Sequence, residues 1–192
     1  MKKQLVIATA ALTASAAPAF AHLDPAAHGS LMAGLSHPLS GADHVLAMVA
    51  VGLWAAQTGG RALWLVPAAF VATMALGFAL AITEAPLPFV EPAILASVVA
   101  LGLIVAMAVR PDAAKAAAIV GAFALFHGHA HGGEIGAAAT ASFAAGFVIA
   151  TALLHAAGIG LGVLLGKLSG GGSVARLLGG LTAAAGGVLM LG

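Results

Sequence analysis

The chain alternates long apolar runs with short polar or glycine-rich breaks. Six of the runs match the ~20 residues that a helix needs to cross a bilayer. These predicted spans lie at residues 38–57, 63–83, 92–109, 113–131, 138–165 and 174–191. The pattern therefore predicts an all-α fold, a polytopic membrane helix bundle with six transmembrane helices.

A shorter apolar segment opens the chain after two lysines and leads to Ala19-Phe20-Ala21. A positive start, a short apolar stretch and a small-x-small site are typical of a cleavable secretory signal. We therefore expect residues 1–21 to be a signal peptide and residues 22–192 to form a single transmembrane domain. An uncleaved first anchor is the alternative, although the apolar stretch is shorter than the ~20 residues that a span needs. Cleavage would leave His22 as the mature N-terminus, where its amine and imidazole could chelate a metal; a polar leader without chemistry is the alternative.

The first predicted span is expected to begin with a break in the helix. Pro38 disfavours a helical conformation at His37, and Gly41 weakens the following turn. The break is therefore expected between Ser36 and Gly41, near His37–Gly41. Discontinuous helices at membrane depth often mark binding sites.

Ionisable side chains gather at this break. His37, Asp43 and His44 lie where the bilayer penalises charged groups by several kcal/mol each, so they are functional candidates. Were the helix unbroken, the seven-residue spacing would put His37 and His44 on one face, and Met48 would extend that face. Asp43 would then point to a neighbouring helix or orient an imidazole. A structural hydrogen-bonded network is the competing interpretation.

A second histidine cluster lies in the fourth predicted span. His127 and His131 are four residues apart and share a helix face, whereas His129 points the other way unless the helix unwinds. Glu134 continues that face only if the helix persists through the two glycines after His131. His155, in the fifth span, is either a further metal ligand on the way inward or a structural histidine.

The placement of charges predicts the orientation. Only 7% of residues are charged, against about 25% in soluble domains. With the mature N-terminus outside, every basic residue after the signal falls on the cytoplasmic side: Arg61, Arg110, Lys115, Lys167 and Arg176. The acidic residues Glu84, Glu91 and Glu134 then fall outside. We therefore expect a bacterial inner-membrane protein with both termini periplasmic and both histidine clusters at the same membrane level.

The donor types restrict the metal. The chain has no cysteine, so a metal would be held by imidazole, carboxylate, thioether or backbone oxygen. Imidazole with carboxylate suits Ni²⁺, Co²⁺, Zn²⁺ or Cu²⁺. A transporter, a zinc-dependent intramembrane hydrolase and a metal-binding assembly or sensor subunit without flux all fit such a site. No Walker-type phosphate loop is present, so a transporter would be secondary or facilitated.

Three sequence blocks resemble the HupE/UreJ family of nickel/cobalt permeases. They are His-Pro-Leu-Ser-Gly-x-Asp-His at residues 37–44, Ala-Met-x-x-Val-Gly-Leu-Trp-Ala at 47–55 and Phe-His-Gly-His-Ala-His-Gly-x-Glu at 126–134. The resemblance covers nearly the whole mature chain and implies uptake of nickel, or cobalt, for hydrogenase or urease maturation. It implies a permease rather than an enzyme, with the metal ion as cargo and no permanently bound cofactor. It also makes His37, Asp43 and His44 the metal motif.

The fifth and sixth predicted spans are rich in glycine and alanine, including Gly162-x-x-x-Gly166. Such small-residue surfaces let helices pack closely, either within one chain or in a homo-oligomer. The expected partners are the metal ion and the lipid bilayer, with no nucleic acid.

Overall fold

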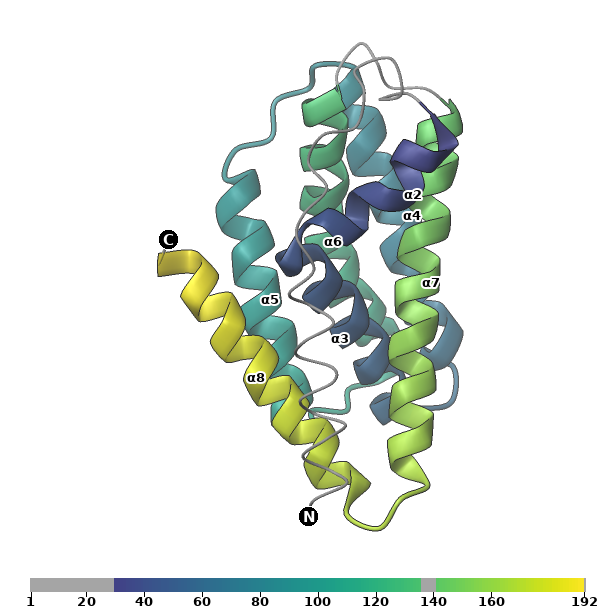
Figure 1. Cartoon of the computed structure of the whole chain (residues 1–192), viewed down its shortest axis with the longest axis vertical. Coiled ribbons are helices and arrows are strands. Elements are labelled where there is room, and N and C mark those ends of the chain that lie inside the picture. The colour runs from purple at the N-terminus through teal and green to yellow at the C-terminus, as the bar shows by residue number, and fades with distance from the viewer. Residues whose placement is uncertain (1–29, 136–140, 192) are drawn as a thin grey trace.

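A computed structural model describes residues 30–135 and 141–191, so the predicted signal peptide and His22 lie outside the described residues. All regular structure in these two ranges is helical: α2 (Leu31–Ser40), α3 (Ala42–Thr58), α4 (Ala62–Ile82), α5 (Val90–Ala106), α6 (Ala113–Ile135), α7 (Ala141–Gly166) and α8 (Gly171–Leu191). Figure 1 shows α4, α5, α6 and α7 running along the long axis, with α8 inclined against α5. The predicted all-α helix bundle is confirmed.

The first predicted span consists of two helices, α2 and α3, which meet at Gly41 at an angle of 88°. The expected break is therefore confirmed. The expectation that Pro38 keeps His37 out of a helix is wrong, because both residues lie inside α2. Pro38 lacks an N–H and so removes one hydrogen bond within α2, whose last four carbonyls also lack helical partners. The Ser40 hydroxyl donates to the His37 carbonyl at 2.6 Å and satisfies one of them.

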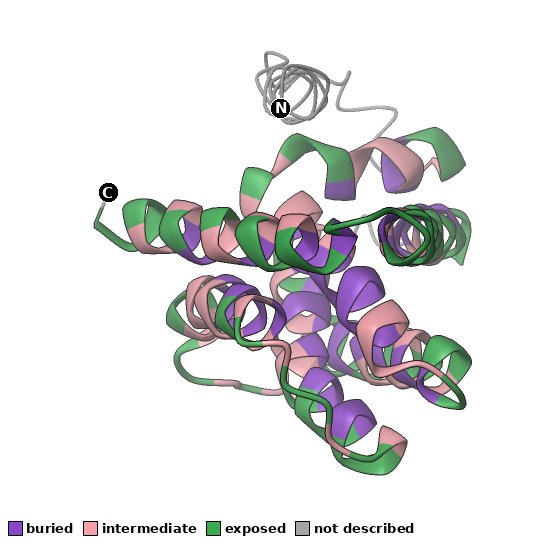
Figure 2. Ribbon diagram, turned by 90° about the horizontal axis from the view of Figure 1, so that it is seen from below, coloured by how far each residue is buried: buried purple, intermediate pink, exposed green. Residues whose placement is uncertain are grey.

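Helix α3 forms the centre of the bundle. Every residue from Ala47 to Ala55 except Val49 is buried, and the helix contacts α4, α5 and α7. Figure 2 shows this burial at the middle of the molecule. A helix that is apolar around its whole circumference is stable only when it is surrounded by other helices. The short helix α2 lies obliquely over α7 instead (Figure 1).

Helix α6 packs closely against α4 and stays regular to Ile135, one turn beyond the predicted end of the fourth span. A Cβ atom on Gly128 would overlap the carbonyl oxygen of Met74, and one on Gly132 would lie 2.7 Å from the carbonyl oxygen of Phe78. Glycine at these two positions therefore lets the backbones of α6 and α4 touch. The persistence of the helix keeps Glu134 on the face that carries His127 and His131.

The small residues of α7 and α8 are used within the chain. Gly158 of α7 lies against α3, and Gly179 and Gly186 of α8 lie against α5. These contacts realise the predicted close packing of the fifth and sixth spans. A homo-oligomer stays a prediction.

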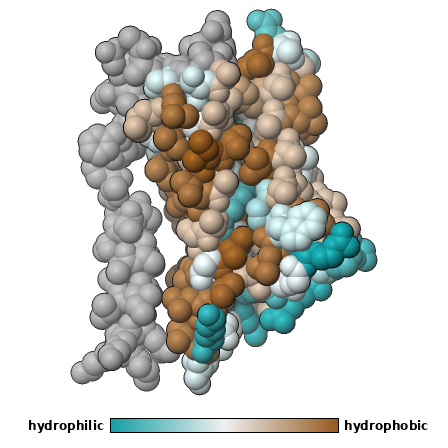
Figure 3. Space-filling view, turned by 90° about the vertical axis from the view of Figure 1, so that its right-hand side faces the viewer, coloured by the Kyte–Doolittle hydropathy of each residue, from teal (hydrophilic) through white to brown (hydrophobic). Residues whose placement is uncertain are grey.

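Much of the face seen in Figure 3 is apolar, with hydrophilic groups toward its lower right. Large hydrophobic side chains such as Trp64, Leu153, Leu177 and Val188 are at least 58% exposed. Among the described helices, α4, α7 and α8 are each long and apolar enough to cross a bilayer, and the bent pair α2–α3 also passes when taken together. Helix α5 is apolar but shorter. An exposed apolar surface of this extent indicates a lipid environment, while the count of six spans stays a prediction.

The basic residues of the described ranges gather toward one end of the bundle, where Asp112 pairs with Lys115. Arg61, Arg110 and Lys167 lie in the connections α3–α4, α5–α6 and α7–α8, which share one end because consecutive helices alternate in direction. Glu84 lies in the α4–α5 connection at the opposite end (Figure 1). Glu134, near the end of α6, lies at the same end as Glu84.

Candidate metal centre

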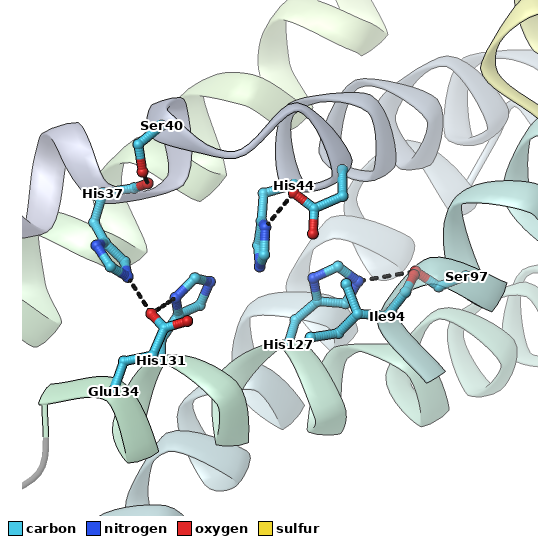
Figure 4. Close-up of polar contacts among 9 residues, drawn as sticks. His37, Ser40, His44, Ile94, Ser97, His127, His131 and Glu134 are labelled. Atoms are coloured by element: carbon cyan, nitrogen blue, oxygen red, sulfur yellow. Dashed lines mark hydrogen bonds and ion pairs between the residues drawn. The ribbon is translucent and has the colours of Figure 1, made fainter. Parts of the chain in front are cut away.

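Four imidazoles from the two histidine segments lie side by side (Figure 4). The ring centroids of His37 and His131 are 4.6 Å apart, those of His131 and His44 are 4.4 Å apart, and those of His44 and His127 are 5.0 Å apart. We call these four residues the imidazole row. Its members come from α2, α3 and α6. His37 and His44 both lie next to His131 because the chain bends at Gly41, and not because they share one continuous helix face.

The outer end of the row adds a carboxylate. Glu134 Oε2 lies 2.9 Å from His37 Nε2 and 3.4 Å from His131 Nδ1. One potential ligand atom from each of these three residues fits within 4.8 Å of the others. The Glu134 side chain is 58% exposed and that of His131 only 4%. The group therefore opens to solvent through its carboxylate and leads inward through its imidazoles.

Asp43 orients the next imidazole. The Nδ1–H of His44 donates to Asp43 Oδ1 at 2.9 Å, so in the neutral ring Nε2 carries the lone pair. Gly41 makes room for this pair, because a Cβ atom there would lie 2.6 Å from Asp43 Oδ1 and 2.9 Å from His44 Nδ1. The glycine at the helix break is thus required by the site as well as by the bend.

Ser97 of α5 orients the innermost imidazole of the row. Its hydroxyl donates to the Ile94 carbonyl at 2.6 Å, so its oxygen accepts the Nε2–H of His127 at 2.9 Å. The unprotonated nitrogen of His127 is then Nδ1, on the side of the ring that faces His44 (Figure 4). Sequence analysis missed Ser97, although it is the one hydroxyl-bearing residue of the predicted span 92–109.

The row contains buried ring nitrogens without hydrogen-bond partners. His44 Nε2, His127 Nδ1 and His131 Nε2 are buried and lack a hydrogen-bond partner among the described residues. A buried polar atom without a partner costs about 1–3 kcal/mol, and such atoms in native proteins call for an explanation. A cation bound between the rings would satisfy these nitrogens.

The other predicted site residues are not members of the row. His129 points away from it and donates from Nε2 to the Ala85 carbonyl at 2.8 Å, as the helical spacing predicts. Met48 is fully buried in α3, one turn after His44, and His155 is buried in α7 next to the ring of Phe70. His22 lies outside the described residues.

If the chain takes up nickel as the family resemblance implies, replacing His129 by alanine should reduce uptake much less than replacing His127. His129 bonds a backbone carbonyl in a connection, whereas His127 carries one of the bare nitrogens of the row. Uptake by the two variants, normalised to the protein in the membrane, checks this expectation. Equal losses would mean that both side chains serve the metal.

Replacing Ser97 by alanine is expected to weaken nickel binding by about tenfold, because residues that orient a metal-binding histidine typically contribute that much. Without the serine oxygen, the proton of His127 is free to occupy Nδ1, the nitrogen that faces His44. Thr73→Val is the matched control, since the Thr73 hydroxyl bonds only carbonyls of its own helix. Nickel titration of both variants measures the difference, and an unchanged affinity in Ser97→Ala would refute the role.

Comparisons with known proteins agree with the resemblance of the histidine motifs. The family model described as HupE / UreJ protein matches residues 10–189. Protein HupE of Rhizobium leguminosarum bv. viciae is 49% identical over 187 residues, which cover 96% of this chain and 97% of that protein. No solved structure matches the chain. Because both matches extend over nearly the whole chain, the chain belongs to the HupE/UreJ family.

Proposed function

We propose that this protein carries nickel, or cobalt, into the cell across the bacterial inner membrane by a secondary or facilitated route. The observation that carries the proposal is the imidazole row, whose neighbouring ring centroids lie 4.4–5.0 Å apart. Three of its members, His44, His127 and His131, have buried ring nitrogens without a hydrogen-bond partner among the described residues. HupE/UreJ proteins are accessory permeases and not enzymes, so the hydrolase interpretation of the same side chains is set aside.

The ion enters at the group formed by His37, His131 and Glu134. The exposed carboxylate of Glu134 attracts the hydrated cation, and the two imidazoles replace part of its water shell. Asp43 contacts His44, farther inside the row. Its carboxylate compensates part of the positive charge of the ion once the ion has left bulk water. This combination of imidazole and carboxylate matches the ligands that Ni²⁺ and Co²⁺ accept.

Movement along the row follows from its spacing. Neighbouring rings are close enough for an ion to gain a nitrogen of the next imidazole before it leaves the last. Because Asp43 and Ser97 hold the protons on the far sides of His44 and His127, the ion meets lone pairs rather than N–H groups. A doubly charged ion that moves inward gains about 4.6 kcal/mol per 100 mV of membrane potential, so no pump domain is needed.

The charges at the two ends of the bundle indicate its orientation in the membrane. With the basic connections on the cytoplasmic side, the end with Glu84 and Glu134 faces the periplasm, as do both termini of the mature chain. Periplasmic carboxylates raise the local concentration of cations at the entry.

Uptake of radioactive nickel into vesicles that contain the purified full chain tests the proposal. We expect saturable uptake that increases when the vesicle interior is made negative, and competition by cobalt and zinc measures the metal preference. Binding of nickel without flux would contradict transport and would favour an assembly or sensor subunit.

A further inference from the structure

His155 is a buried histidine that the imidazole row does not use. Its side chain is 1% exposed, and neither Nδ1 nor Nε2 has a hydrogen-bond partner among the described residues. A structural histidine in an apolar helix ordinarily bonds a carbonyl or a hydroxyl. His155 therefore offers a lone pair on the way from the row toward the basic end of the bundle.

Phe70 lies next to both His155 and the inner end of the row. Its ring centroid is 5.7 Å from that of His127 and 4.9 Å from that of His155. All three side chains are at most 1% exposed. The aromatic ring of Phe70 is thus the apolar contact shared by the two imidazoles.

Two further donor atoms lie one helical turn from these residues. Thr151 precedes His155 by one turn of α7, and Met74 follows Phe70 by one turn of α4. The Thr151 hydroxyl donates to Met74 Sδ at 3.6 Å, and both side chains are fully buried. A hydroxyl oxygen and a thioether sulfur therefore meet on the helix faces that carry His155 and Phe70.

We propose that His155, Met74 and Thr151 form a second, inner metal-binding station, separated from the imidazole row by Phe70. The inference rests on the proposed transport function: the ion would bind at this station after it leaves the imidazole row. Imidazole, thioether and hydroxyl donors suit a late first-row transition-metal ion and exclude a hard ion such as Mg²⁺. The station holds no carboxylate, so it binds the ion more weakly than the outer group with Glu134 and allows release.

A surface hollow adjoins the station and points toward the basic end. His155 lines it together with Leu63, Pro67 and Ile159 of α4 and α7. Leu63 and Pro67 lie in the first turns of α4, next to the connection that carries Arg61. The hollow therefore extends from His155 toward the end of the bundle that the charges assign to the cytoplasm.

Nickel binding by the purified full chain, with Ni²⁺ alone as the probe, tests the station. We expect a second, weaker nickel ion beside the first, and sulfur in the nickel X-ray absorption spectrum. The chain has no cysteine and six methionines, so any sulfur bound to nickel comes from methionine. His155→Ala should remove the second ion and leave the first.

Conservative variants protect the test against misfolding. Met74→Leu and Thr151→Val keep the side-chain volume nearly constant, and Met74→Leu should abolish the sulfur signal and weaken the second ion by about tenfold or more. Met107→Leu, which makes the same chemical change at an exposed position, should alter neither. All station variants should bind the first ion and lose most of their uptake into vesicles.

A single bound ion in the unaltered chain, or a second ion that persists in both His155→Ala and Met74→Leu, would overturn the station. If the variants that lost the second ion transport as fast as the unaltered chain, its role in transport is likewise overturned. If the unaltered chain binds two ions in this manner without flux, the station stands and the proposed transport function fails.

Discussion

Single replacement of His37, Asp43 or His44 by alanine is expected to abolish nickel accumulation while the protein still reaches the membrane. His37→Ala removes a ligand from the outer group, His44→Ala interrupts the row, and Asp43→Ala frees the proton of His44 and removes a negative charge. Even the loss of a residue that only orients a metal ligand typically lowers metal affinity by about 10–100-fold, and loss of a ligand itself should cost at least as much.

Accumulation of radioactive nickel in cells, normalised to the amount of membrane protein, measures this loss. Leu39→Ala is the matched control, because Leu39 lies in α2 beside the motif but is 58% exposed. Asp43→Asn separates the two effects of Asp43, since the amide oxygen still accepts the Nδ1–H of His44 but carries no charge. Full uptake by all three alanine variants would remove these residues from the transport path.

Replacement of Gly128 by alanine is expected to disrupt the packing of α6 on α4. The added methyl would overlap the backbone carbonyl of Met74, and neither helix can yield without moving the row that α6 carries. Overpacking of this kind costs about 1–3 kcal/mol or more, and nickel binding should fall together with stability.

Gly133→Ala provides the control for this substitution in the same helix. A Cβ atom on Gly133 meets nothing within 4 Å, so alanine there should leave stability unchanged or raise it by about 0.5–1 kcal/mol. Thermal unfolding of both variants in detergent gives the comparison. Similar melting temperatures for the two would show that α4 and α6 are not in close contact at Gly128.

Several features of the site follow from the sequence by local rules. The helical spacing separates His127 and His131 from His129, and it holds because α6 is regular throughout that segment. Alternation of antiparallel helices then brings the start of the first span and the end of the fourth to the same end of the bundle. Pro38 and Gly41 predict the break, but only Gly41 interrupts the helix.

The remaining features depend on contacts between helices that no local rule contains. The two glycines after His131 would weaken an isolated helix. In the structure, α6 nevertheless continues past Glu134, and α4 packs closely against it at Gly132. Ser97 looks like an ordinary small residue in an apolar helix until His127 is seen to face it. The same holds for Phe70 beside His127 and His155.

Nickel affinity measured for His44→Ala, His127→Ala and the double variant tests most directly whether the two histidine segments hold one ion. If the segments share an ion, the nickel affinity of the double variant should be close to that of the single variant with the lower affinity. The coupling energy between the two substitutions would then be about 1–3 kcal/mol. If the two losses add in the double variant, the segments bind separate ions and the shared site is contradicted.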